Sequence, residues 1–145
     1  MTVNFFVPGQ PQGKDRHRTT KGGHTYTPKK TVEYEALIMS KYWKAVAESR
    51  GVLTSAEKAG AVRIAITAIY KVPVSDNKAT KAAKLANAVK PKAKPDLDNI
   101  AKVVLDALNN TAYYDDAQVY RLEVMKEFGA VPGLFITVIH EGAQL

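Results

Sequence analysis

The sequence contains no cysteine and no long run of apolar residues. Without cysteine, the chain forms no disulfide and no zinc site built on thiolates. No apolar stretch reaches the roughly 20 residues that a membrane-spanning helix needs. The first residues also lack the charged segment and apolar core of a signal peptide. These absences predict a cytoplasmic protein with no membrane partner.

Acidic residues are scarce in the first two thirds of the chain. Residues 1–95 hold 18 Lys and Arg against 6 Asp and Glu, whereas residues 96–145 hold 3 against 8. The whole chain carries a net charge of +7. This excess of positive charge favours nucleic acid as a partner, although an acidic surface would attract it as well. The length predicts a single domain over residues 1–145.

Five aspartates gather in residues 94–116, where the sign of the charge changes. They are Asp96, Asp98, Asp106, Asp115 and Asp116. An aspartate cluster inside a cationic chain indicates a divalent metal ion that works on a phosphate of a polyanion. Mg²⁺ prefers oxygen ligands and keeps several waters, so two or three carboxylates suffice. We therefore expect Mg²⁺ as the cofactor, with Mn²⁺ as a substitute.

The spacing within this stretch predicts a helix over residues 97–109, with Asp96 suited to cap its start. Apolar side chains recur at steps of three and four, which predicts one buried stripe. Its members are Leu97, Ile100, Val104 and Leu108. Asp98, Lys102 and Asp106 recur at steps of four and therefore share the polar front of the helix.

The polar front and the neighbouring aspartates form a candidate metal site. Asp96 and Asp98 lie at the helix start, where backbone N–H groups favour anions. A third carboxylate, from Asp115 or Asp116, closes the site if the following loop folds back. Lys102, one turn beyond Asp98, is placed to contact a phosphate or its leaving oxygen. The structural alternatives are a helix cap, a surface ion pair and a turn, and each is common by itself.

Residues 96–108 and 115–119, together with residues 8–16, form two motifs that resemble the RusA family of Holliday junction resolvases. One is D-L-D-N-x-x-K-x-x-x-D-A-L over residues 96–108, followed by D-D-A-Q-V over residues 115–119. The other is P-G-x-P-x-x-K-x-R over residues 8–16, whereas residues 72–92 match least. The resemblance implies that the catalytic residues are Asp96, Asp98, Lys102 and Asp116, with the three aspartates as metal ligands.

The resemblance also implies supporting residues and partners. Asp115 supports the site or ligates in place of its neighbour, Asn99 lies beside Asp98, and Asp106 is a partner of Lys102 or a plain surface acid. The family acts on four-way DNA junctions as a homodimer and is common in phages and prophages. We therefore expect a homodimer that binds branched DNA in a bacterial host cell.

Two basic segments are candidates for binding DNA. Residues 8–30 are predicted to form a flexible loop, and residues 78–94 carry six lysines and no acid. A solvated surface is the structural alternative for either charge run. The expected contacts to phosphates come from Lys14, Arg16, Arg18, Lys90, Lys92 and Lys94.

The periodicity along the chain predicts an α+β fold, in which helices pack on one face of a small mixed β-sheet. Strands are predicted over residues 3–7, 62–70, 119–128 and 134–140, and further helices over residues 27–50 and 78–88. The last two strands, joined by a turn around residues 129–133, are predicted to pair as an antiparallel hairpin.

Three functions compete at this point. The first is a Mg²⁺-dependent structure-selective endodeoxyribonuclease that resolves four-way junctions by paired phosphodiester hydrolysis in recombination and repair. The second is a basic protein that binds branched DNA without cutting it. The third is a metal-dependent phosphohydrolase of small substrates, against which the wide cationic surface argues. The intact carboxylate set favours the first, because carboxylates without a metal repel phosphate.

Overall fold

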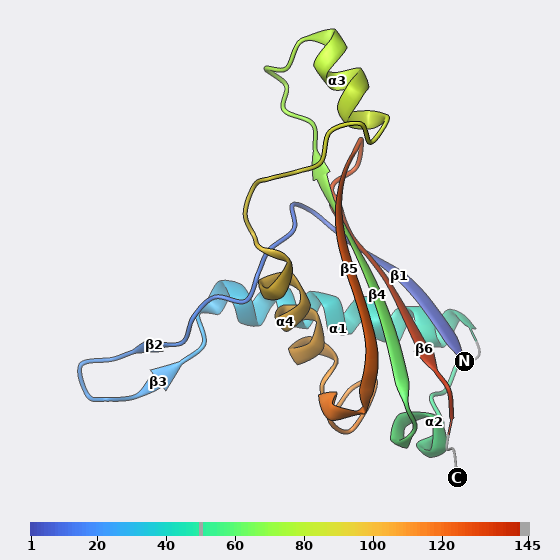
Figure 1. Cartoon of the computed structure of the whole chain (residues 1–145). Helices are drawn as coiled ribbons and strands as arrows, with labels where there is room; N and C mark the ends of the chain where they lie inside the picture. The colour runs from blue at the N-terminus through green and yellow to red at the C-terminus, as the bar shows by residue number, and fades with distance from the viewer. Residues whose placement is uncertain (50, 143–145) are drawn as a thin grey trace.

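A mixed four-stranded sheet forms the centre of the molecule, and helices cover one of its faces (Figure 1). This computed structural model describes residues 1–49 and 51–142. In sheet order, the strands are β1 (Thr2–Pro8), β6 (Gly133–His140), β4 (Val62–Lys71) and β5 (Val119–Gly129). β4 and β5 are parallel, and the other pairs are antiparallel. The predicted α+β class is therefore confirmed.

Two long helices, α1 (Lys29–Ser49) and α4 (Leu97–Leu108), supply most of the cover. The shorter elements are α2 (Ser55–Ala59), α3 (Lys78–Leu85), the 3₁₀ turn η1 (Asp116–Gln118), and the strands β2 (Arg18–Thr19) and β3 (Thr25–Tyr26). β2 and β3 pair as a small hairpin that projects away from the sheet (Figure 1). None of the described helices is long and apolar enough to cross a membrane.

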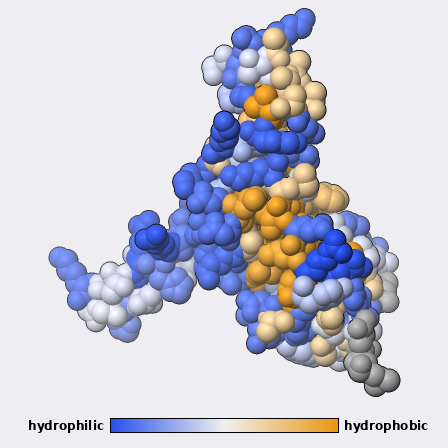
Figure 2. All heavy atoms as spheres, in the orientation of Figure 1, coloured by the Kyte–Doolittle hydropathy of each residue, from blue (hydrophilic) through white to orange (hydrophobic). Residues whose placement is uncertain are grey.

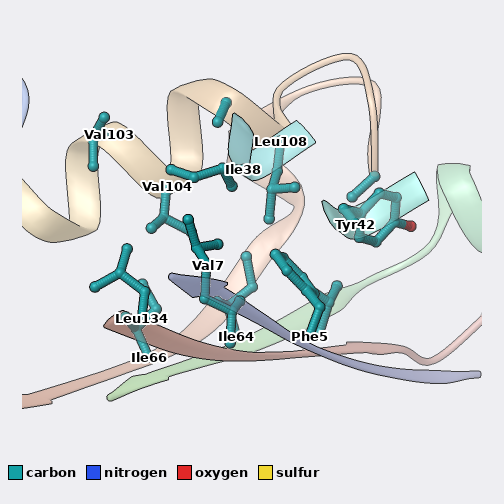
Figure 3. Packing of buried hydrophobic residues seen from close by; sticks show 14 of the residues in the cluster. Phe5, Val7, Ile38, Tyr42, Ile64, Ile66, Val103, Val104, Leu108 and Leu134 are labelled. Atoms are coloured by element: carbon teal, nitrogen blue, oxygen red, sulfur yellow. The ribbon is translucent and has the colours of Figure 1, made fainter. Parts of the chain in front are cut away.

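The core lies between the sheet and the two long helices (Figure 3). Buried and half-buried residues alternate along β4, because successive strand side chains point to opposite faces. Ile64 and Ile66 of β4 pack in one cluster with Ile38 of α1 and with Val104 and Leu108 of α4. Burial of each such side chain stabilises the fold by about 1.5–3 kcal/mol, which fixes α4 against the sheet.

The predicted hairpin of the last two strands is wrong. β6 lies between β1 and β4, and β5 lies on the far side of β4. Chain proximity and the turn around residues 129–133 favoured direct pairing. β6 pairs with both β1 and β4 and is an inner strand, whereas β5 pairs with β4 and is exposed along much of its length, which an edge position allows for its charged side chains.

Smaller differences concern the ends of elements. α1 begins at Lys29, two residues after the predicted start, and the predicted end at Arg50 lies outside the described residues. Leu97 was expected in the buried stripe of α4 but is 43% exposed, because it begins the helix beyond the edge of the core. The small hairpin and α2 were predicted only as irregular connections.

The connection from β4 to β5 carries both basic and acidic features. Parallel neighbours need a crossover connection, and this one contains α3 and then α4. We call residues 72–93 the arm. With α3, the arm projects beyond the end of the sheet before the chain returns to α4 (Figure 1). Lys90 and Lys92 of the arm follow α3 and lie on the segment that leads into α4.

Candidate active site

Asp96 occupies the cap position of α4 but does not cap it. Its backbone is extended, and its side chain makes no hydrogen bond to the helix start. Instead the ammonium of Lys94 donates to both carboxylate oxygens, at 2.9 and 3.0 Å. This hydrogen bond lowers the pKa of Asp96 from its ordinary value, so the carboxylate is fully ionised at neutral pH. A cation thus already binds this carboxylate, and the interpretation of Asp96 as a simple cap does not hold.

The polar front of α4 behaves differently from a surface ion pair. Asp98 and Lys102 are both exposed, and in the described part of the chain neither side chain makes a hydrogen bond or an ion pair. Asp106 does not pair with Lys102. Its carboxylate forms an ion pair with the ammonium of Lys14, and the two charged atoms lie 3.1 Å apart. Asp98 and Lys102 therefore remain available to a ligand on one side of the helix.

Lys14 holds the loop after β1 against two helices. Its ammonium lies 2.5 Å from Glu35 of α1 and 3.1 Å from Asp106 of α4, and its side chain is only 10% exposed. Burial alone would lower the pKa of Lys14, but its hydrogen bonds to the two carboxylates outweigh this and raise it. Lys14 was predicted to bind DNA. In this structure its ammonium forms ion pairs with two protein carboxylates.

The turn at residues 115–118 explains the D-D-A-Q sequence. Asp115 accepts a hydrogen bond from the backbone amide of Ala117 at 3.1 Å, and so caps η1. The Gln118 side chain accepts from the amides of Tyr114 and Asp115 and donates to the carbonyls of residues 58 and 60. Asp115 thus has a structural role, and both Asp115 and Asp116 are exposed.

The two carboxyl groups of this turn affect each other. A hydrogen bond with Asp115 raises the pKa of Asp116, and the negative charge of Asp106 raises it further. The amide of Ala117 and the proton shared with Asp116 lower the pKa of Asp115. The charge of Lys102 lowers the pKa of Asp116, so this aspartate lies within electrostatic reach of the middle of α4.

The predicted metal ligands come from two elements. Asp96 and Asp98 lie at the start of α4, and Asp116 begins η1, where the charges of Asp106 and Lys102 of α4 reach it. Within residues 1–49 and 51–142, no three Asp, Glu, His or Cys side chains converge as ligands of one ion. Asp96 and Asp98 fit an ion that keeps most of its waters, but they form no three-carboxylate site with Asp116.

Two residues beside Asp96 escaped the sequence analysis. Lys126 of β5 donates to the carbonyl of Ala93 at 2.8 Å and lowers the pKa of Asp96 through its charge. The Tyr70 hydroxyl donates to the carbonyl of Pro95 at 3.1 Å. Lys126 could have been noticed, because it interrupts the apolar alternation of Leu122, Val124 and Phe128. Tyr70 gave no such signal, since an aromatic residue at a strand end is ordinary.

Basic side chains lie on both sides of α4. Arg16 and Arg18 are exposed at the stem of the small hairpin, and Lys90, Lys92 and Lys94 are exposed between α3 and α4. Asn99 is half-buried, and its carbonyl accepts from the amide of Lys14 at 3.1 Å. Figure 2 shows hydrophilic surface over the hairpin and towards α4, and a hydrophobic patch near the middle of the view beside β5.

Comparisons with known proteins identify the family of the chain. The family model described as endodeoxyribonuclease RusA matches residues 8–139. The uncharacterized protein YqaN of Bacillus subtilis (strain 168) is 31% identical over 144 residues, which cover 94% of each chain. The matched region includes the loop after β1, α4 and η1, so all the candidate residues lie within it.

Proposed function

The chain belongs to the RusA family of endodeoxyribonucleases, and from this premise we propose that it is a Mg²⁺-dependent nuclease that resolves four-way DNA junctions. Paired phosphodiester hydrolysis would serve recombination and repair in the cytoplasm of a bacterial cell. The observation that carries the proposal is the start of α4. There, Asp96 binds the ammonium of Lys94 instead of capping the helix, and within the described residues the side chains of Asp98 and Lys102 make no hydrogen bond or ion pair.

Asp96 and Asp98 would hold the metal ion, which supplies positive charge to the phosphate and to the leaving oxygen. Lys94 now binds Asp96 and would turn to a DNA phosphate when the ion arrives. Lys102 is one helical turn from Asp98 and would stabilise the negative charge that develops on the leaving oxygen as its bond to phosphorus breaks. Asp116 is proposed as a third ligand that joins when DNA draws the turn at residues 115–118 towards the start of α4.

The DNA path proposed here crosses α4 between two basic projections. The small hairpin with Arg16 and Arg18 lies on one side, and the arm with Lys90 and Lys92 lies on the other (Figure 1). Guanidinium groups make bidentate hydrogen bonds to phosphate oxygens, and lysines attract phosphates as point charges. Both kinds of contact fix the position of a duplex arm without reading its sequence. The scissile phosphate then lies over the polar front of α4.

A second copy of the chain is proposed to cover the open face of the sheet. The strand register aligns Phe6, Phe135, Thr67 and Met125 in one row across four strands, on the face opposite the helices. Phe135 and Met125 are 45% and 50% exposed. An apolar row across an uncovered sheet face is typical of an interface between subunits. A two-fold dimer would present two sites to two strands of a junction.

One observation favours a second candidate, a protein that binds junctions without cutting. Asp116 does not join Asp96 and Asp98 in this structure, and an incomplete ligand set would leave the metal weakly bound. The deciding experiment compares a labelled four-way junction with linear duplex of the same sequence, for wild type and Asp98→Asn, with and without Mg²⁺ or Mn²⁺. Paired nicks by wild type with metal, and tight binding without nicks by Asp98→Asn, support the nuclease. Tight binding without cleavage under all conditions supports the binding protein.

A further inference from the structure

A polar cleft of about 270 Å³ opens directly beside the start of α4. Its walls come from three segments: residues 11–13 and 15 of the loop after β1, residues 30 and 31 of α1, and residues 94 and 95. Lys94, on its rim, is also the residue that binds both oxygens of Asp96. The cleft and the candidate metal ligands are thus immediate neighbours.

The walls of the cleft are held in place without any ligand. The amide of Asp15 donates to the hydroxyl of Thr31 at 3.3 Å, which ties the loop to the start of α1. Gly13 packs so closely on α4 that a Cβ atom there would lie 2.8 Å from Pro95 and 2.9 Å from Asn99. Lys14 and its two carboxylate partners lock the same loop from the other side. A preformed cleft loses little entropy when a ligand binds.

The lining combines flat apolar surfaces with polar edges and cations. Pro11 is buried and Pro95 is half-buried, and both line the cleft as apolar residues. Gln12 and Asp15 supply an amide and a carboxylate, and Lys30 adds a second ammonium at the rim. A nucleotide has the matching parts: a flat base with donors and acceptors at its edge, and an anionic phosphate on each side.

We infer that this cleft receives an unstacked base of the cleaved strand, next to the phosphate that lies over Asp96 and Asp98. The inference rests on the proposed function, because it places the DNA strand across α4. At a junction, bases at the branch point have lost one stacking neighbour, so turning one outward costs less there than inside a duplex. Gln12 and Asp15 then contact the edge of the base and contribute to the choice of cleavage position.

The direct test uses 2-aminopurine, a fluorescent base whose emission rises when it leaves the stack. It is placed singly at each position that flanks the branch of a four-way junction, and the protein is added without metal, so that no cleavage occurs. We expect the emission at one position to rise several-fold with wild type. Gln12→Phe, which fills the cleft, should abolish most of this rise. Gln10→Phe is the matched control, because Gln10 is exposed in the same loop and does not line the cleft.

Thermal unfolding and junction affinity of both variants establish that they fold and bind DNA. The inference is overturned if wild type raises the emission at no position, or if Gln12→Phe raises it as much as Gln10→Phe does. Gln12→Ala provides a smaller change and should shift the distribution of cleavage positions on a mobile junction. If wild type unstacks the base but never cuts with Mg²⁺, the inference about the cleft stands and the proposed nuclease activity is wrong. If wild type cuts without unstacking a base, only the inference about the cleft is wrong.

Discussion

Lys14, which the sequence predicts to bind DNA, joins three parts of the fold in this structure. A lysine in a basic loop is normally solvated, and nothing in the local sequence identifies Glu35 and Asp106 as its partners, because both are distant in the chain. The pKa of Lys14 is raised above 10.5, so its charge is present at neutral pH. Its stabilising contribution is complete below pH 10.5 and is lost only as the pH rises through the folded-state value.

Lys14→Met should lower the free energy of unfolding by about 1–3 kcal/mol, because two neighbouring carboxylates lose their shared charged donor. The measurement is urea unfolding at pH 7, followed by fluorescence of the single tryptophan. Lys21→Met is the control, since Lys21 is exposed at the tip of the small hairpin. Equal unfolding midpoints for wild type and Lys14→Met would show that the ion pairs do not stabilise the fold.

Asp116 should bind a proton more tightly than an ordinary aspartate in the metal-free protein, because Asp115 shares that proton. Asp115→Asn should lower the pKa of Asp116, since an amide donates to the carboxylate without repelling it. The asparagine oxygen can still accept from Ala117 and cap η1. NMR titration of the carboxyl carbons measures both values. The pKa of Asp96, set by Lys94, should stay below its ordinary value in both proteins and serves as the internal reference.

At the scale of elements, periodicity predicted the strands and helices well, because burial on one face leaves a repeat of two or of three to four residues. α4 was placed correctly, and so was the polar front with Asp98 and Lys102. Strand order was not, since nothing within β5 or β6 encodes that β4 lies between them. The position of Asp116 could not be predicted from the local sequence either. It depends on how Gln118 anchors η1 to the carbonyls of residues 58 and 60, which are distant in the chain.

The arm should supply a measurable part of the electrostatic affinity for DNA. Replacing Lys90 and Lys92 by alanine should reduce the slope of log affinity against log salt by about 2, because each lysine on a phosphate releases about one counterion. Fluorescence anisotropy with a labelled junction, over a series of salt concentrations without metal, gives the slope. The matched control replaces Lys41 and Lys44 of α1, which lie beside β1. Equal slopes for the arm variant and wild type would show that the lysines of the arm do not contact DNA phosphates.

At the scale of the whole molecule, the two faces of the sheet have different roles. One is covered by α1 and α4 and carries the candidate site at its edge. The other presents an apolar row that no element of the described chain covers. Charge is divided as well, since lysines and arginines dominate before α4 and acids after it. Under the proposed function, the basic segments would contact DNA, and the apolar row would be covered by a second copy.

Phe135→Glu should therefore convert a dimer into a monomer of 15.9 kDa, because it places a charge at the centre of the apolar row. Sedimentation velocity measures the mass, and the same variant should nick junctions singly rather than in pairs. Val32→Glu is the control, since Val32 is also apolar and exposed but lies on α1. A dimer that survives Phe135→Glu would place the interface elsewhere.

The arm leaves and rejoins the domain at two fixed points. It begins where β4 ends at Lys71, and it returns where Lys126 and Tyr70 hold the carbonyls of Ala93 and Pro95. We therefore expect that its length and composition can change without moving Asp96 or Asp98. In that case, related chains could come to bind different branched DNA by exchanging this one insertion. For protein engineering, we expect the arm to be a point of exchange, at which a new DNA preference is introduced beside an unchanged candidate site.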